Sequence, residues 1–224
     1  MNQNEQTERD QLTGFRTAEA VEKAFDKYLQ EAADKEESLS VAIIDLDNFR
    51  TFNEKHGYGY GNGIIKRVAK IILQHIPQSA VPGRFGGEEF ILLFPRTERE
   101  EAFLILERIR SECDQETEIS NGEEIILARC SISAGVAGYP ADGTTIPDLL
   151  RKIEQALYRA KVSGRNRICI AQEEKMIPKT AHFTATQLER LTQLAREESV
   201  PEAVLLREAL DCLLRKYTVS KKIA

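Results

Sequence analysis

Two short apolar runs joined by a glycine-containing turn constrain the fold of this chain more than any other feature. The candidate strands Val81 to Phe85 and Phe90 to Phe94 flank the segment Gly-Gly-Glu-Glu (86–89). Paired glycines between two strands favour a hairpin whose turn has positive φ, because a side chain resists that conformation. The sequence therefore predicts a β-hairpin with two acidic residues at its tip.

A second acidic pair closes another apolar run, Val41 to Ile44. The pair is Asp45 and Asp47, and the hairpin supplies Glu88 and Glu89. Sites that bind two divalent metal ions hold them about 3.5–4 Å apart and need clustered oxygen ligands. Acids at two neighbouring strand ends meet that need and indicate nucleotidyl transfer. The hairpin alone is equally compatible with an ordinary solvated acidic turn.

The spacing of apolar residues outlines the remaining elements. It predicts helices over 18–33, 64–76, 98–113 and 146–163, strands over 41–46, 81–85, 90–94, 124–137 and 167–171, and a glycine-rich loop over 57–63. This order suits an antiparallel-centred sheet with helices packed on it. The fold class that we predict is α/β (α+β), with a ferredoxin-like or polymerase-palm layout.

The composition changes after Gln172, which predicts a second, smaller unit. We expect a polar tail over 1–9, a main domain over 10–172, a linker over 173–178, a small module over 179–217 and a tail over 218–224. The module begins with a short candidate strand, 179–183, and continues with helices over about 185–198 and 200–216. Between these helices, Ser199 and Glu202 have the spacing of a capping box.

Composition limits the compartment and the partners. Of the 224 residues, 30% are charged and 42% hydrophobic, which is typical of a soluble globular chain. No apolar run approaches the roughly 20 residues that span a bilayer, and the polar start is not a signal peptide. We therefore expect a cytoplasmic protein without a membrane partner. The net charge of −5 argues against a broadly basic nucleic-acid coat but leaves room for a local DNA-binding face.

Several separate motifs occur in one order over residues 10 to about 171. They are Asp10-Gln-Leu-Thr-Gly14, Asp45-Leu-Asp-Asn-Phe-Arg50, Asn53, Gly57-Tyr-Gly-Tyr-Gly-Asn62, Arg84-Phe-Gly-Gly-Glu-Glu-Phe90, and Ala156-Leu-Tyr-Arg-Ala-Lys161 followed by Gly164-Arg-Asn166. With these motifs the segment resembles a GGDEF domain, the catalytic module of diguanylate cyclases. The resemblance implies the palm-like fold that the elements already suggest.

The resemblance also implies a role for individual residues. Metal ligands for Mg²⁺ (or Mn²⁺) would be Asp45, Glu88 and the carbonyl of Leu46, and Glu89 would help to position the metal or activate the ribose 3′-hydroxyl. Residues that hold substrate would be Arg50, Lys161 and Arg165 on the triphosphate, Gly86 and Gly87 beneath the nucleotide, and Asn53 and Asn62 at the base. Two domains would face each other as a homodimer, each presenting GTP, and would form cyclic di-GMP with release of pyrophosphate.

Asn62 departs from the family pattern, which usually has Asp at this position. An Asp accepts two hydrogen bonds from guanine, whereas an amide offers one acceptor and one donor. The amide pattern complements the edge of adenine. Two alternatives stay open: an enzyme that still uses GTP, and one that accepts ATP and forms an adenine-containing cyclic dinucleotide.

A second departure lies just before the hairpin. Many relatives carry an Arg-x-x-Asp product-binding site there, and this chain has Pro77-Gln-Ser-Ala80. We therefore expect no product inhibition through that site.

The segment from Lys179 to Tyr217 resembles a ribbon-helix-helix module. Such modules are obligate dimers whose paired strands enter the DNA major groove. Thr180 and His182 alternate with apolar neighbours, so with Lys179 they are the candidate DNA-binding residues. Two alternatives are a helical hairpin that only dimerises and a transcriptional regulator whose GGDEF domain only senses nucleotides. The short segment before residue 10 leaves no room for a sensor, so we expect control through the C-terminal end.

Overall fold

The computed structural model describes residues 8–172 and 180–197, and in the last stretch residues 202, 203, 205, 206, 209, 210 and 213. The chain divides into two compact units, Met1–Glu174 and Lys175–Ala224. Each unit is described by itself below.

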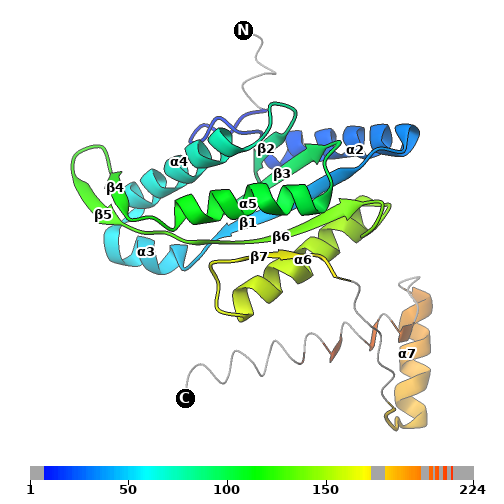
Figure 1. Cartoon of the computed structure of the whole chain (residues 1–224). Coiled ribbons are helices and arrows are strands. Elements are labelled where there is room, and N and C mark those ends of the chain that lie inside the picture. Colours follow the sequence, from blue (N-terminus) through cyan, green and yellow to red (C-terminus); the bar gives the residue numbers. More distant parts are fainter. Residues whose placement is uncertain are drawn as a thin grey trace. The chain divides into compact units, whose positions relative to one another are not determined.

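The first unit is built on a five-stranded sheet (Figure 1). Its strands are β1 (Leu39–Leu46), β2 (Val81–Arg84), β3 (Glu89–Pro95), β6 (Ile132–Tyr139) and β7 (Ile168–Ile170), in the spatial order β2-β3-β1-β6-β7. β1 lies at the centre and pairs antiparallel with both β3 and β6, whereas β6 and β7 are parallel. The predicted mixed α/β fold with an antiparallel-centred sheet is confirmed.

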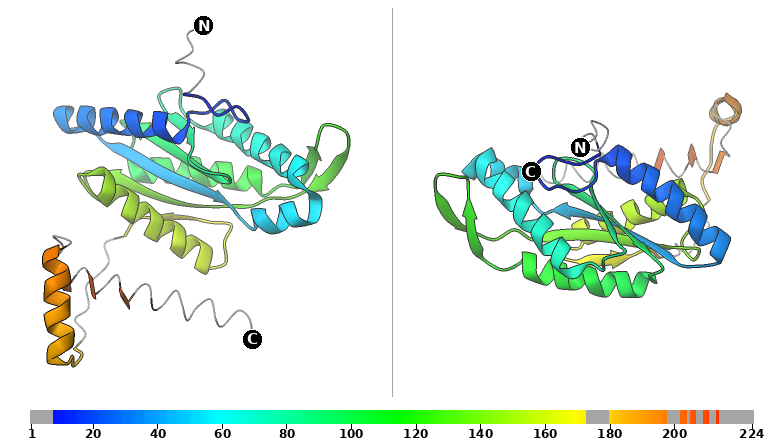
Figure 2. Two further views of the ribbon diagram at one scale, coloured as in Figure 1. Left: turned by 180° about the vertical axis from the view of Figure 1, so that it is seen from behind. Right: turned by 90° about the horizontal axis from the view of Figure 1, so that it is seen from above.

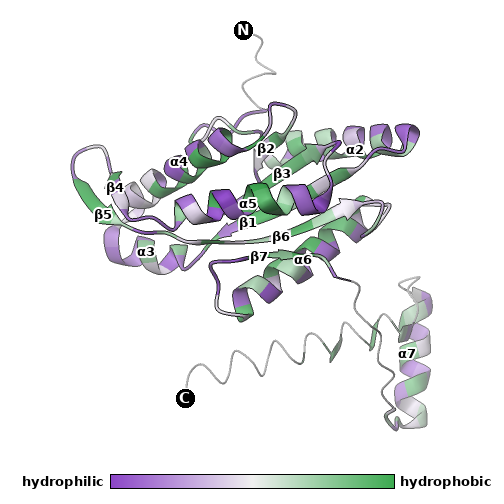
Figure 3. Ribbon diagram, viewed as in Figure 1, coloured by the Kyte–Doolittle hydropathy of each residue, from purple (hydrophilic) through white to green (hydrophobic). Residues whose placement is uncertain are grey.

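Helices cover both faces of this sheet (Figure 2). They are α2 (Ala18–Lys35), α3 (Phe49–His56), α4 (Tyr58–His75), α5 (Arg99–Cys113) and α6 (Ile146–Val162). The side chains of α2 and α6 join Val41 and Ile43 of β1 in one apolar cluster. Those of α4 and α5 join Ala42 and Ile44 in another. Because successive strand residues point to opposite faces, β1 is buried on both sides, and Figure 3 shows it as largely hydrophobic.

The prediction of a glycine-rich loop over 57–63 is wrong, because all but the first of these residues lie in α4. Gly57, with φ of 89°, separates α3 from α4. Inside the helix, a Cβ on Gly61 would lie 1.9 Å from the side-chain oxygen of Asn53, and one on Gly63 would lie 2.6 Å from the carbonyl of Ser120. These glycines therefore allow close packing against α4, and their cost in helix propensity is accepted for that contact.

Two further predictions need correction. The expected strand over 124–137 is two strands, β5 (Ile125–Ala128) and β6, separated by residues 129–131. β5 pairs with β4 (Thr117–Ser120), which the sequence did not reveal. In the β2–β3 turn neither Gly86 nor Gly87 has positive φ. The turn is longer than a two-residue hairpin loop, so its backbone does not need the left-handed region.

The second unit contains α7 (Ala185–Glu197), at the predicted position of its first helix. The described residues from 202 to 213 are also helical. The hydroxyl of Thr192 donates to the Glu202 carboxylate at 2.6 Å. Residues 180–184 form no strand in this single chain. Lys179 and Ser199 lie outside the described residues. Among the helices that the structure describes, none combines the length and the apolarity needed to cross a bilayer.

Candidate functional site

The register of β1 and β3 brings two acidic residues face to face. Asp45 is the Cα partner of Glu89, and the backbone N–H of Leu46 donates to the carbonyl of Glu88 at 3.3 Å. Directly opposed residues of an antiparallel pair have Cβ atoms about 4.5–5.5 Å apart. The structure therefore places all three predicted metal-binding acids, Asp45, Glu88 and Glu89, at one end of the sheet.

Asp45 is nearly buried and forms an ion pair with Lys161. Its side chain is 10% exposed, and Lys161 on the last turn of α6 places its ammonium 2.7 Å from Oδ2. Burial raises the pKa of Asp45, and the hydrogen bond and charge of Lys161 oppose that rise. The charge of Arg165 opposes it as well, so both predicted phosphate-binding cations of this region act on Asp45.

Glu89 shares the same cation under less favourable conditions. Burial raises the pKa of Glu89, and the neighbouring charge of Asp45 raises it further, while Lys161 opposes the rise. Two carboxylates near one ammonium leave negative charge that a further cation would balance. No group of three or more His, Cys, Asp or Glu side chains in the described part of the chain is already arranged around a metal position. The oxygen-only donor set nevertheless fits a hard divalent ion.

Asp47 does not belong to this acidic group, although it lies two residues from Asp45. Its Oδ1 accepts from the Ser133 hydroxyl at 2.7 Å. Its Oδ2 accepts from the Ser131 hydroxyl at 2.8 Å and from the backbone N–H of Asn166 at 2.9 Å. The acidic pair suggested by the sequence is therefore divided between two environments.

The base-reading candidates differ in burial. Asn53 on α3 has a side-chain oxygen that is buried and has no hydrogen-bond partner among the described residues. It lies over Gly61 of α4, where the missing Cβ leaves space. Such an orphaned acceptor is uncommon in proteins and calls for a donor from a ligand or water. Asn62 is exposed on α4 and borders an open cavity between α4 and the β4–β5 hairpin.

The remaining predicted substrate residues are not drawn together. Arg50 is exposed and forms an i,i+4 ion pair with Glu54 at 2.9 Å, directed along its own helix. Gly86 and Gly87 are exposed in the turn. A Cβ on Gly87 would meet no atom within 4 Å, so the space over this backbone is open.

Arg84 is a site residue to which sequence reasoning gave no role. Its guanidinium donates to both oxygens of Asp10, at 3.2 and 3.1 Å, and to the carbonyl of Gly87 at 2.7 Å. Asp10 also accepts from the backbone and hydroxyl of Thr13. The arginine thus fastens the acidic hairpin to the turn at residues 10–14. The only signal in the sequence was its presence in the motif next to Gly86.

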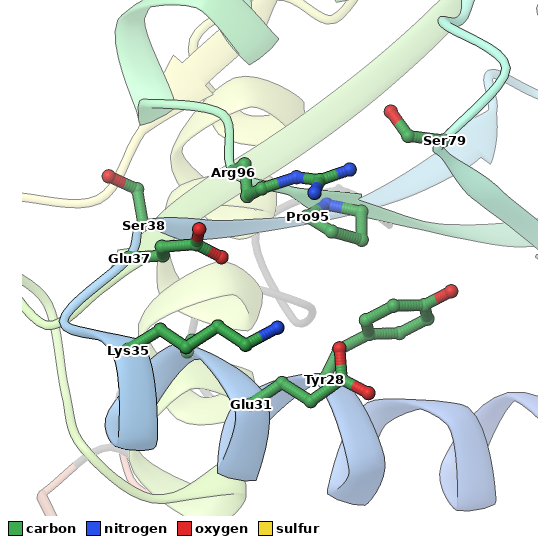
Figure 4. A pocket seen from close by; sticks show the side chains of 9 residues that line it. Tyr28, Glu31, Lys35, Glu37, Ser38, Ser79, Pro95 and Arg96 are labelled. Atoms are coloured by element: carbon green, nitrogen blue, oxygen red, sulfur yellow. The ribbon is translucent and has the colours of Figure 1, made fainter.

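A second cavity lies at the opposite end of the β1–β3 ladder, about 20 Å along the strands from Asp45. Its volume is about 190 Å³. Ser79, from the segment Pro77–Ala80 just before β2, is one of its lining residues. Figure 4 shows side chains of both charges around it, with Lys35 and Glu31 from α2 and Arg96 after β3.

Comparison with protein families identifies both parts of the sequence. The family model described as "Diguanylate cyclase, GGDEF domain" matches residues 7–167. The model described as "Ribbon-helix-helix domain" matches residues 177–218.

Individual relatives agree with the first match. Diguanylate cyclase A of Treponema denticola is 31% identical over 144 residues, which cover 64% of this chain and 38% of that protein. A diguanylate cyclase of Vibrio cholerae is 36% identical over 135 residues, covering 60% and 40%. The chain thus spans well under half the length of these curated relatives.

Solved structures agree as well. The GGDEF domain of DgcB from Caulobacter crescentus, in complex with c-di-GMP, matches with a TM-score of 0.67 and 29% identity over 73% of this chain and 95% of that one. The active GGEEF domain of a diguanylate cyclase from Vibrio cholerae matches with a TM-score of 0.60 and 32% identity over 66% and 92%.

Proposed function

Because the chain belongs to the GGDEF family of diguanylate cyclases, we propose that it joins two molecules of GTP into cyclic di-GMP with release of two pyrophosphates. Each ribose 3′-oxygen attacks the α-phosphorus of the other nucleotide and loses its proton. Each α-phosphorus loses pyrophosphate as it gains the new bond. The named relatives and the solved GGDEF structures support this assignment.

One observation carries the proposal to particular residues. Asp45 and Glu89 face each other across β1 and β3, and Lys161 compensates them only in part. The site therefore carries excess negative charge before substrate binds. Asp45, Glu88, Glu89 and the carbonyl of Leu46 would hold Mg²⁺ or Mn²⁺. When bound, the metal would neutralise phosphate charge and favour the 3′-alkoxide. Lys161 and Arg165 would contact the triphosphate.

The test is product formation by Glu88→Ala. With GTP and Mg²⁺, the unaltered chain should form cyclic di-GMP and Glu88→Ala should form essentially none. Glu123→Ala, at an exposed acid of the β4–β5 turn, is the matched control and should behave like the unaltered chain. If the unaltered chain makes no more product than Glu88→Ala, the enzyme assignment fails. Chelation with EDTA should stop the reaction, and added Mg²⁺ or Mn²⁺ should restore it.

The active form would be a homodimer, since each domain presents one nucleotide. In the second unit, large apolar side chains remain about half exposed in the single chain: Phe183, Leu188, Leu194, Leu206, Leu210 and Leu213. The ribbon-helix-helix match supports pairing through this unit. A tethered pair of cyclase domains would gain effective concentration for the two-nucleotide reaction. Sedimentation should show a dimer, and loss of residues 175–224 should lower activity most at low protein concentration.

Asn62 favours a second candidate product. An amide at this position offers a donor and an acceptor to the edge of adenine, and the unpartnered oxygen of Asn53 offers a further acceptor. The chain would then accept ATP and form a mixed or adenine-containing cyclic dinucleotide. Mass spectrometry of the products from GTP, ATP and their mixture decides the matter. Cyclic di-GMP alone, from the mixture, would reject this candidate.

The second unit supports a DNA-binding role beside or instead of the enzymatic one. Thr180 and His182 are exposed, and Lys179 precedes them in the sequence. A regulator of this kind would use its GGDEF domain to sense nucleotides. Fluorescence anisotropy on DNA flanking its own gene, compared with a shuffled duplex, tests it. Equal affinity for both duplexes would leave dimerisation as the only role of this unit.

A further inference from the structure

Asp47 connects two distant segments of the chain through the three hydrogen bonds that it accepts. Its backbone N–H also donates to the carbonyl of Ser131 at 2.9 Å, so the residue is bound at its backbone and at both side-chain oxygens. Ser131 and Ser133 hold the carboxylate from the β6 side. The third donor, the N–H of Asn166, comes from the loop between α6 and β7, 119 residues away in the sequence.

Asn166 is itself held from a second direction. Its side-chain oxygen accepts from Arg110 at 3.0 Å, and its side-chain nitrogen donates to Asp114 at 2.9 Å. Both partners belong to the end of α5, and Asp114 is fixed in turn by Arg129 at 2.7 Å. Asn166 therefore joins the end of β1 to the end of α5 through one residue.

The residue before it is one of the predicted triphosphate contacts, Arg165. Gly164, Arg165 and Asn166 all have positive φ, at 112°, 63° and 47°. Consecutive left-handed residues with side chains are unfavourable and persist only where neighbouring contacts impose them. The backbone N–H of Arg165 donates to the carbonyl of Ala160 at 3.0 Å. In the described part of the chain its guanidinium makes no hydrogen bond or ion pair, yet its charge reaches Asp45.

From this geometry we propose that Asp47 and Asn166 are positioning residues that hold Arg165 toward the phosphate groups of the nucleotide. The two acids that follow one another on β1 have separate tasks: Asp45 faces the reacting groups, and Asp47 anchors the loop that carries the cation. The backbone of Arg165 is fixed while its guanidinium stays available, so ligand binding does not first have to order the loop. This inference rests on the proposed function for the identity of the ligand.

The test compares affinity for GTP with affinity for GMP, measured by calorimetry. The first variant is Asn166→Gly, because glycine accepts the positive φ at no cost and keeps the backbone N–H to Asp47, while the contacts to Arg110 and Asp114 are lost. The second is Asp47→Asn, which keeps the side-chain shape and removes its charge. We expect each to weaken GTP binding about tenfold and GMP binding little, as loss of a charged contact does. We call the Asp47–Asn166 contact the latch. The double variant should lose much less GTP affinity than the product of the two single losses, because both residues belong to this one contact.

Asp142→Asn is the matched control. Asp142 is equally buried and accepts a backbone N–H and an arginine, but at the opposite end of the sheet. It should lower the melting temperature and leave the ratio of GTP to GMP affinity unchanged.

The outcomes separate the latch from general stability and from the enzyme assignment. If both latch variants leave the ratio of GTP affinity to GMP affinity unchanged, the inference is wrong. If the unaltered chain binds GTP and the latch variants lower the ratio, but no product forms, the cyclase assignment fails and the latch stands. If product forms and the ratio does not change, the latch alone fails.

Discussion

The two ends of the central sheet treat their buried polar groups in opposite ways. At the end away from Asp45, the Ser40 hydroxyl donates to the carbonyl of Thr97 at 2.7 Å. Asp142 accepts from the Gly138 N–H at 2.8 Å and from Arg99 at 2.6 Å. These buried polar side chains therefore all have hydrogen-bond partners. At the other end, Asp45 and Glu89 oppose each other with one shared ammonium, and the oxygen of Asn53 has no partner in the described structure.

The difference separates polar groups that hold the fold together from groups that would bind a ligand under the proposed function. A satisfied buried carboxylate contributes to stability and is costly to remove. Opposed carboxylates and an orphaned acceptor cost stability, and they persist where function requires them. Asp47 shows that the two kinds lie close together, since it is satisfied although Asp45 is two residues away.

The largest effect is expected at the end of the sheet where Asp45 and Glu89 oppose each other. Glu89→Gln keeps the shape of the side chain and removes the charge that opposes Asp45. We expect cyclic dinucleotide formation to fall on the order of a thousandfold, because a charged group is lost where reacting phosphates must be stabilised. The melting temperature without metal should stay the same or rise, as determined by calorimetry. A clear fall in melting temperature would contradict the view that this end is strained.

The second prediction concerns the opposite end of the sheet, where Asp142 has its hydrogen-bond partners. Asp142→Asn should lower the free energy of unfolding by about 2–3 kcal/mol, since the charge-assisted bond to Arg99 is lost in a buried position. Turnover per folded molecule should not change. Urea unfolding and an activity assay below the transition measure the two quantities. Loss of turnover in the folded protein would mean that the two ends are coupled.

The third prediction compares two variants that each add a single methyl group. Gly61→Ala places a Cβ against the oxygen of Asn53, whereas Gly87→Ala places one in open space. The first should cost about 1–2 kcal/mol of stability and weaken nucleotide binding, because Asn53 must move. The second should leave stability unchanged within about 0.5 kcal/mol and reduce only substrate binding. Equal stability of the two variants in thermal unfolding would show that Asn53 is not held by this contact.

The smallest effect concerns pH. Burial raises the pKa of Asp10, but the hydrogen bonds from Thr13 and the charge of Arg84 outweigh this effect and hold the pKa below that of an ordinary aspartate. The resulting stabilisation is present above the pKa of Asp10 in the unfolded chain and is lost as the pH falls through the folded-state pKa. Asp10→Asn should therefore be less stable near neutral pH, by about 1 kcal/mol or less, and should show a weaker decline in strong acid. Identical acid-unfolding curves would contradict this contribution.

The sequence predicted the sheet better than the segments around it. The apolar runs that became β1 and β3 bury alternate residues on both faces, so composition alone marks them as strands. The glycine-rich segment misled, because glycine signals both loops and close helix packing. Only the tertiary contact of Gly61 with Asn53 distinguishes the two. β4 is short and largely polar, and it is a strand only because β5 pairs with it.

The candidate site was predictable as a set of residues but not as a set of contacts. Motif order located Asp45, Glu89 and Lys161 without showing that the lysine binds the aspartate. The separate environment of Asp47 depends on Ser131, Ser133 and Asn166. The two serines belong to no motif, and the motif that contains Asn166 does not show that its backbone reaches Asp47. Likewise, nothing local indicates that Arg84 reaches back over 74 residues to Asp10.

That last contact makes the guanidinium of Arg84 a mechanical coupling between the start of the domain and its acidic hairpin. One planar group grips Asp10 on one side and the carbonyl of Gly87 on the other. Torque applied to the chain near Asp10 would therefore reach the tip of the β2–β3 turn without passing through the core. A displacement at Asp10 would move the carbonyl of Gly87, which directly precedes the acidic residues Glu88 and Glu89. Arg84 thus links the position of the β2–β3 turn to the position of the chain at Asp10.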